Sequence, residues 1–153
     1  MSDSTVSVPA PAARFSDATA AFWLLRLFLG LRTLLAGVEK FELSGTYGFS
    51  NYYTTMSKMA TGITANSFLP LWCTKLFAIP LGYVLILLGV ALLLGLKTRL
   101  ALIAMGLVYV GLGFGLMAVQ SNDGVAWIGV YVGMTVGALL LVRHNRFALW
   151  PDK

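Results

Sequence analysis

The sequence predicts an all-α membrane protein: a four-helix transmembrane bundle with a short amphipathic helix in its first outer loop. Of the 153 residues, 58% are hydrophobic and only 11% are charged. The mean hydropathy is +0.81, which is outside the usual composition of soluble domains. A bilayer core of roughly 30 Å needs about 20 mostly apolar residues per helix. Four stretches meet this requirement, at about 20–41, 77–96, 100–119 and 125–143.

The first 19 residues are expected to form an extended or disordered tail, and residues 20–150 a single transmembrane domain. The tail is rich in Ser, Ala and Pro. The apolar run after it is too long and too charged for the core of a signal peptide. We therefore expect this run to stay attached to the protein as its first helix.

The distribution of basic residues predicts the orientation in the membrane. The tail, the 96–100 turn and the C-terminus carry Arg14, Lys97, Arg99, Arg143, Arg146 and Lys153, whereas the other side carries Lys40, Lys58 and Lys75. The positive-inside rule therefore predicts that both termini lie in the cytoplasm and the loop 42–76 outside. The expected location is the bacterial cytoplasmic membrane. The net charge of +5 follows from this asymmetry and gives no indication of nucleic-acid binding.

The outer loop contains the expected amphipathic helix. Apolar residues recur there at helical spacing: Phe49, Tyr52, Tyr53, Met56, Met59, Ala60 and Ile63. Such a pattern is typical of a helix that lies on the membrane surface, and Ser50 or Asn51 is suited to cap it. Pro70 and Pro80 are expected to flank the beginning of the second span, with Cys73 in the loop between them.

The chain has one cysteine and one histidine, and this excludes several classes of redox protein. A thiol relay needs a cysteine pair, and a bis-histidine haem needs two histidines. No His, Cys and carboxylate residues have the spacing of zinc ligands. We therefore expect no catalytic residues, no metal site and no covalently attached cofactor in the chain.

Small residues on the third and fourth spans predict close helix packing. Gly111 and Gly115 form one GxxxG motif, and Gly129, Gly133 and Gly137 form a longer one. Residues four apart lie on the same helical face, and glycine there lets a neighbouring backbone approach closely. These helices are expected to pack against each other, against a partner subunit or against a second copy of the chain.

Four charged residues in the first span require an explanation. Arg26 and Lys40 lie near its ends, where long side chains reach the lipid headgroups at low cost. Arg32 lies near mid-membrane, where an unpaired charge costs several kcal/mol. Glu39 is rotated from Arg32 by roughly 20° and is some 10 Å further along the helix. The two residues therefore share a stripe without direct contact.

Two interpretations of this stripe remain open. Arg32 either anchors neighbouring helices or helps to form a polar pocket for a ligand or partner. In both cases the guanidinium is expected to face the bundle interior, within reach of Glu39, the hydroxyl of Tyr83 or Tyr109, or the carbonyl of a bound quinone. Arg26 and Lys40 complete the set of candidate ligand residues.

Three segments of the sequence resemble the DoxX family of small four-helix membrane proteins. The first span, LLRLFLGLRTLLAGVEKF, has the family pattern at Leu24, Leu25, Arg26, Gly30, Gly37, Lys40 and Phe41. The second span matches the family's glycine-rich hairpin at Gly89, Gly95, Thr98 and Arg99. The ending HNRFALWPD resembles the family's closing motif, with Ala148 in place of Ser, Trp150 in place of Asp, and an aspartate displaced to Asp152.

This resemblance implies a membrane component of a redox system, similar to the small membrane subunit of thiosulfate:quinone oxidoreductase. The first functional hypothesis is therefore a subunit that supports a quinone-linked oxidoreductase, with the redox cofactor on a partner chain and quinone as a candidate ligand. The second is a structural accessory subunit that contacts only lipid and partner proteins. The third is a small transporter, which is disfavoured because Glu39 lies near the end of its helix.

Overall fold

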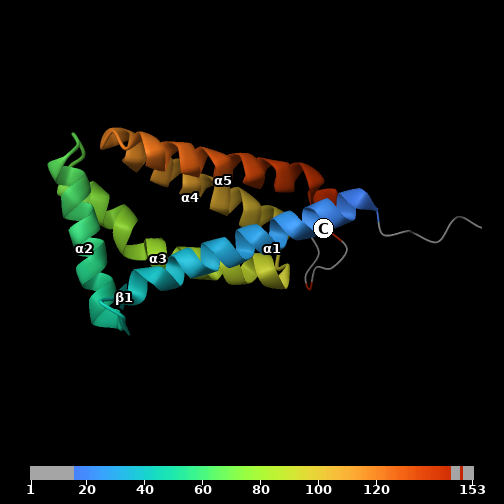
Figure 1. Ribbon diagram of the computed structural model, residues 1–153, viewed down its shortest axis with the longest axis horizontal. Helices are drawn as coiled ribbons and strands as arrows, with labels where there is room; N and C mark the ends of the chain where they lie inside the picture. The colour runs from blue at the N-terminus through green and yellow to red at the C-terminus, as the bar shows by residue number, and fades with distance from the viewer. Residues whose placement is uncertain (1–15, 146–148, 150–153) are drawn as a thin grey trace, which may run out of the picture.

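The computed structural model describes residues 16–145 and residue 149, and it has the expected all-helical architecture (Figure 1). The elements are α1 (Asp17–Val38), η1 (Glu39–Phe41), β1 (Glu42–Leu43), β2 (Thr46–Tyr47), α2 (Phe49–Ala65), α3 (Leu71–Leu94), α4 (Thr98–Ala118), α5 (Asn122–Leu141) and η2 (Val142–His144). In this part of the chain α1, α3, α4 and α5 are long and apolar enough to span a membrane. Helix α2 lies across one end of the bundle (Figure 1). The predicted fold class is confirmed.

All four spans begin earlier than the sequence predicted, and for α1 and α3 this changes the neighbouring segments. Helix α1 begins at Asp17 because the side chain of Ser16 caps it, accepting the Thr19 N–H at 3.3 Å. The predicted tail therefore ends in helix, and its residues 1–15 lie outside the described part. Helix α3 begins at Leu71, directly after Pro70, so Cys73 is a helical residue and not a loop residue. The connection between the first two spans is correspondingly shorter than 42–76.

Helix α3 continues without interruption through Pro80. A proline inside a helix has no N–H to donate and leaves nearby backbone groups without their helical partners. The hydroxyl of Tyr52 on α2 replaces them: it donates to the Ile79 carbonyl and accepts the Gly82 N–H, the latter at 3.1 Å. Tyr52 is fully buried, and burial raises the pKa of its hydroxyl, so the donating proton is retained. The tyrosine therefore joins α2 to the bend in α3.

Helix α2 follows a short hairpin and is capped differently from the prediction. The hairpin pairs Glu42 with Tyr47. The N-cap of α2 is Gly48, with extended backbone, and not Ser50 or Asn51. The amide of Asn51 donates instead to the Thr46 carbonyl at 3.0 Å, so this side chain links the helix to the hairpin.

The closest helix contact in the bundle joins α1 to α3, on a set of glycines that the sequence analysis did not assign to packing. A Cβ added at Gly89 would lie 2.7 Å from the Leu34 backbone nitrogen, and one at Gly37 would lie 2.9 Å from the Gly82 carbonyl oxygen. Backbone atoms cannot move aside as a flexible side chain can. Glycine at these positions therefore sets the distance between the two helices.

Helices α4 and α5 pack against each other as predicted, but most of their motif glycines lie outside this contact. Among the described residues, nothing lies within 4 Å of a Cβ added at Gly115, Gly129 or Gly133, and Gly137 would meet only a leucine methyl at 3.9 Å. Gly111 alone is in close contact, with the ring of Phe77 at 2.9 Å. The motif shows which faces permit close approach, but α5 turns this face away from the bundle and is the least buried span.

Substitution of Gly89 by alanine should therefore destabilise the protein, whereas Gly133→Ala should not. The added methyl at position 89 forces α1 and α3 apart, and overpacking of this kind costs about 1–3 kcal/mol. At position 133 alanine meets no atom and improves helix propensity by up to about 1 kcal/mol. Thermal unfolding of both variants in the same detergent measures the difference. Equal unfolding temperatures would contradict the assignment of the α1–α3 contact.

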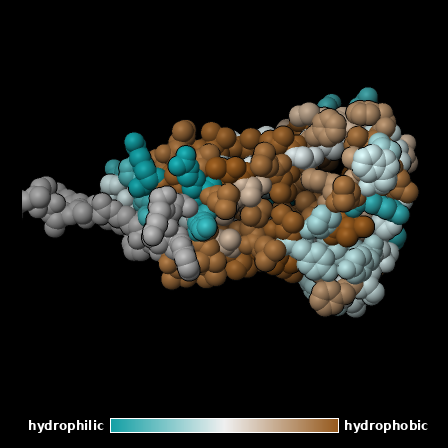
Figure 2. Space-filling view, turned by 180° about the vertical axis from the view of Figure 1, so that it is seen from behind, coloured by the Kyte–Doolittle hydropathy of each residue, from teal (hydrophilic) through white to brown (hydrophobic). Residues whose placement is uncertain are grey.

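The four spans are arranged as two pairs, α1 with α3 and α4 with α5. Figure 1 shows the four spans close together near the beginning of α1, with α1 diverging from α4 and α5 towards the end that carries α2. On the face that Figure 2 shows, hydrophobic residues cover the spans and hydrophilic residues gather towards the two ends. This distribution is that of a membrane-spanning domain. The divergence leaves room between the pairs, and α2 covers it.

Candidate functional site

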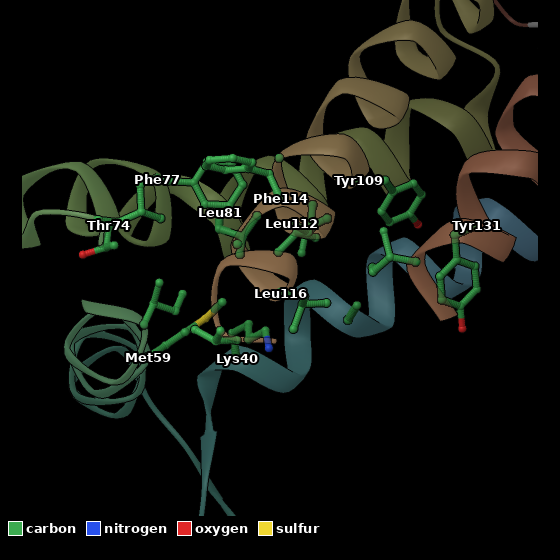
Figure 3. Close-up of a pocket in the computed structure, with 18 of the residues that line it drawn as sticks. Lys40, Met59, Thr74, Phe77, Leu81, Tyr109, Leu112, Phe114, Leu116 and Tyr131 are labelled. Carbon is green, nitrogen blue, oxygen red and sulfur yellow. The ribbon is translucent and has the colours of Figure 1, made fainter. Parts of the chain in front are cut away.

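A cavity of about 500 Å³ lies between the two helix pairs, below α2. Figure 3 shows side chains from α2, α3, α4 and α5, and Lys40 from η1, arranged around it. The lining is mostly apolar: Ala36, Met59, Ile63, Leu69, Phe77, Leu81, Leu85, Leu112, Phe114, Leu116, Val119 and Ile128. Phe77 on α3 and Phe114 on α4 also remain 38% and 53% exposed. The cavity therefore reaches the lipid-facing surface between these helices.

Arg32 from α1 lines this cavity at its polar end. Its Nε donates to the hydroxyl of Tyr131 on α5 at 3.2 Å, and its guanidinium carbon lies 5.7 Å from the centre of that ring. Its Nη1 lies 3.9 Å from Oε2 of Glu39. The acceptor is therefore Tyr131 and not Tyr83 or Tyr109. Arg32 and Glu39 therefore form a long ion pair without a hydrogen bond, because the two long side chains extend towards each other along the helix.

Tyr109 forms the neighbouring part of the polar end. Its hydroxyl lies 2.7 Å from Oγ1 of Thr33, which is also 3.0 Å from the sulfur of Met105. The rings of Tyr109 and Tyr131 are stacked, with centroids 5.7 Å apart and an interplanar angle of 26°. Both tyrosines line the cavity and appear together at one side of it in Figure 3. One cation and two phenol groups therefore converge in an otherwise apolar space.

Other polar groups lie towards the α2 end of the cavity. Lys40, Cys73 and Thr74 belong to its lining, and Figure 3 shows Lys40 and Thr74 well away from the tyrosines. Oγ1 of Thr74 donates to the Leu71 carbonyl and lies 2.9 Å from Oγ1 of Thr64. This threonine therefore holds the beginning of α3 against α2, and Lys40 adds a second positive charge to the cavity wall.

The GxxxG motif of α4 also borders the cavity. Gly111 and Gly115 both belong to its lining. Because glycine has no side chain, this stretch of α4 presents backbone to the cavity and leaves the space open. The two glycines therefore help to set the shape of the cavity, a role that the sequence analysis did not predict.

Arg26 lies outside the cavity, at the opposite end of α1, and the prediction that it reaches the headgroups is wrong. The residue is only 4% exposed. Its Nε and Nη2 donate to the carbonyls of Leu92 and Leu93 at 2.7 and 2.9 Å, and its Nη1 donates to Oδ1 of Asn145 at 3.1 Å. The last carbonyls of α3 carry partial negative charge and attract the guanidinium inward. Arg26 is therefore a structural anchor.

Tyr83 also lies away from Arg32, and Glu39 approaches only from outside the cavity. The ring of Tyr83 packs edge-on against Phe41 and Tyr52, with centroids 5.5 and 4.9 Å apart. Glu39 lies in η1 with its side chain 61% exposed. Of the six candidate ligand residues, the structure places Arg32, Lys40 and Tyr109 in the cavity wall.

Sequence reasoning missed Tyr131, Phe77 and Cys73 as cavity residues. Like Tyr109, Tyr131 is a phenol within an apolar span, so it could have been selected as a candidate hydrogen-bond partner of Arg32 on the same grounds. Phe77 and Cys73 could not be recognised as cavity residues, because the sequence analysis placed Phe77 at the end of a helix and Cys73 in a loop. Their position depends on the continuation of α3 through Pro80.

The arrangement is suited to hold a lipid-soluble molecule that carries a hydrogen-bonding group at one end. Ligand cavities in proteins have about 300–1,000 Å³ and are mostly apolar with a few placed polar groups. Among the residues that the structure describes, no group of three or more His, Cys, Asp or Glu side chains is placed to hold a metal ion. The available chemistry there is hydrogen bonding and electrostatic stabilisation by Arg32, Tyr109 and Tyr131.

Comparison with known proteins gives one result. The family model described as DoxX matches residues 21–119, from α1 to the end of α4, and these helices provide most of the cavity wall. No significant match is found among curated proteins or among solved structures. The closing motif falls after the matched region, and its residues 146–148 and 150–152 lie outside the described part. Because the family model covers more than half of the chain, this membrane protein belongs to the DoxX family.

Proposed function

We propose that the protein is a membrane subunit of a quinone-linked oxidoreductase, that it holds a quinone in the cavity, and that the redox cofactor resides on a partner chain. The observation that carries this proposal is the position of Arg32, Tyr109 and Tyr131 at one end of a mostly apolar cavity of about 500 Å³. A quinone has carbonyl acceptors on a flat ring and an apolar tail. The cavity offers a matching division between donors and apolar surface.

The hydrogen bonds at the polar end favour a carbonyl ligand. Because the Tyr131 hydroxyl accepts from Arg32 Nε, its own proton is available to donate to a ligand. The two Nη groups of Arg32 provide further donors, since the nearest carboxylate oxygen is as far as 3.9 Å. Hydrogen bonds to a charged donor contribute about 1.5–3 kcal/mol. A quinone that accumulates negative charge on its oxygens would be stabilised at this position.

Access and orientation complete the proposal. The exposed edges of Phe77 and Phe114 give a lipid-soluble ligand lateral access from the membrane. We place the protein in a bacterial cytoplasmic membrane with its termini in the cytoplasm and α2 outside, as the basic residues favour. The open glycine face of α5, at Gly129 and Gly133, offers a backbone surface on which a helix of the partner subunit or of a second copy can pack.

The variant Arg32→Leu tests the site directly. We expect it to remain folded, because Arg32 is partly exposed and its one side-chain hydrogen bond is to Tyr131. Quinone that co-purifies with the protein should fall about tenfold, which corresponds to the loss of about one hydrogen bond to a charged group. The measurement is quinone per protein after gentle purification, together with the unfolding temperature.

Two results would contradict the proposal. If Arg32→Leu failed to fold, the residue would be an anchor like Arg26. If the unmodified protein contained no quinone but retained a partner chain, the structural accessory function would replace the proposed one.

A further inference from the structure

A second hollow of about 580 Å³ lies on the outside of the α2 end, between α2 and α3. Helix α2 contributes Tyr53, Thr54, Ser57, Lys58 and Thr61 to it, and α3 contributes Lys75 and Ile79. Unlike the cavity inside the bundle, this groove has mainly polar and basic side chains. It shares no lining residue with that cavity.

Lys58 from α2 and Lys75 from α3 both line this groove. No acidic residue belongs to its lining, and within the described residues neither Lys58 nor Lys75 forms an ion pair. Two positive charges on the wall of one groove repel each other. An anion bound in the groove would relieve this repulsion.

The hydroxyl groups complete a polar wall. Oγ1 of Thr54 donates to the Ser50 carbonyl, and Oγ1 of Thr61 donates to the Ser57 carbonyl, both at 3.0 Å. Because these two donors are occupied within α2, the groove offers a ligand the ammonium groups and the hydroxyl groups of Ser57 and Tyr53. Such a set suits an oxyanion of a single charge.

The groove lies where lipid headgroups meet the protein. Trp72, one turn of α3 before Lys75, is 70% exposed, and tryptophan is enriched at the membrane interface. On the bundle side of Lys75, Leu76 and Ile79 are 71% and 43% exposed. A phosphate between the lysines would therefore have an apolar surface beside it on which acyl chains can lie.

We propose that the groove at Lys58 and Lys75 binds the phosphate of an anionic phospholipid, with the acyl chains along Leu76 and Ile79. Phosphate supplies the anionic oxygens that lysine recognises, and basic residues at a membrane surface attract anionic lipids. The site is independent of the quinone cavity. It would fix α2 against the membrane and so hold the cover of the cavity in place.

Lipid binding to the purified, delipidated protein tests this assignment. Native mass spectrometry follows titration with phosphatidylglycerol or with phosphatidylcholine of the same acyl chains. The unmodified protein should bind phosphatidylglycerol at least about tenfold more tightly than phosphatidylcholine. The double variant Lys58→Gln/Lys75→Gln should lose this preference. Lys97→Gln, at the opposite end of the bundle, should keep it.

Three outcomes would overturn the assignment. The first is an equal affinity for the two lipids in the unmodified protein, and the second is an unchanged preference in the double variant. The third is displacement of phosphatidylglycerol by millimolar inorganic phosphate, which would identify a free phosphate site. An unfolding temperature of the double variant that matches the unmodified protein, measured without lipid, would exclude misfolding as the cause of lost binding. Failure of the lipid test leaves quinone retention unaffected, so the two proposals are tested separately.

Discussion

Replacement of Arg26 by leucine is expected to destabilise the protein by at least about 3 kcal/mol, with little folded protein recovered from the membrane. The substitution removes hydrogen bonds to the Leu92 and Leu93 carbonyls and to Oδ1 of Asn145. Each hydrogen bond to a charged group contributes about 1.5–3 kcal/mol, and a buried partner left without a donor adds its desolvation cost. Thermal unfolding in detergent and the folded yield measure the effect.

The loss should extend beyond α1. The amide of Asn145 also donates to Oγ1 of Thr98 at 2.7 Å, so Arg26 connects the beginning of α1 to the end of α3, the beginning of α4 and the segment after α5. Arg143→Leu is a suitable control, because Arg143 is exposed at the same end of the protein and such changes usually stay within about 0.5 kcal/mol. If Arg26→Leu unfolded at the same temperature as this control, the anchor would be disproved.

The contrast between Arg26 and Arg32 shows what sequence reasoning could and could not predict. Position along the helix correctly indicated that a mid-membrane arginine must face protein. It could not reveal that the arginine near the helix end is the more deeply buried of the two. That outcome depends on α3 ending beside Arg26, so that its last carbonyls and Asn145 surround the guanidinium. Such a contact between distant segments is absent from local sequence patterns.

The fold was more predictable than its internal contacts. Four apolar stretches and one amphipathic stretch were enough to obtain the helices, because hydrophobic length and period follow directly from the bilayer and the helix geometry. The glycines were harder to interpret. A GxxxG motif identifies a face that permits close approach, yet Gly30, Gly37, Gly82 and Gly89 carry the close contacts. Gly115 borders the cavity, and Gly133 faces outward.

The cavity itself could not be predicted, because it results from the divergence of the helix pairs. That divergence depends on the bend of α3 at Pro80 and on Tyr52, which supplies the bent backbone with hydrogen bonds. Sequence patterns showed the proline and the tyrosine but not their meeting. The sequence analysis placed Arg32 within reach of Tyr109 and grouped Lys40 with them, but in the same set as Arg26 and Tyr83, which lie elsewhere. The common location of Arg32, Lys40 and Tyr109 became visible only with the geometry of all four helices.

Replacement of Gly115 by leucine should abolish quinone retention while leaving the fold intact. A Cβ at this position meets nothing within 4 Å, so the substitution causes no clash with the protein. The rest of the leucine side chain occupies space that borders the cavity, where a ligand would otherwise lie. We therefore expect an unfolding temperature close to that of the unmodified protein and no quinone detectable after purification.

Gly133→Leu is the matched control, because Gly133 is also free of neighbours within 4 Å but lies on the outward face of α5 and not in the cavity lining. It should retain quinone and lose the partner subunit, whereas Gly115→Leu should lose quinone and retain the partner. The two added side chains are identical, so any difference must come from the space that each occupies. Loss of quinone from both variants would place the ligand at the α5 interface, and retention in both would show that the cavity does not hold it.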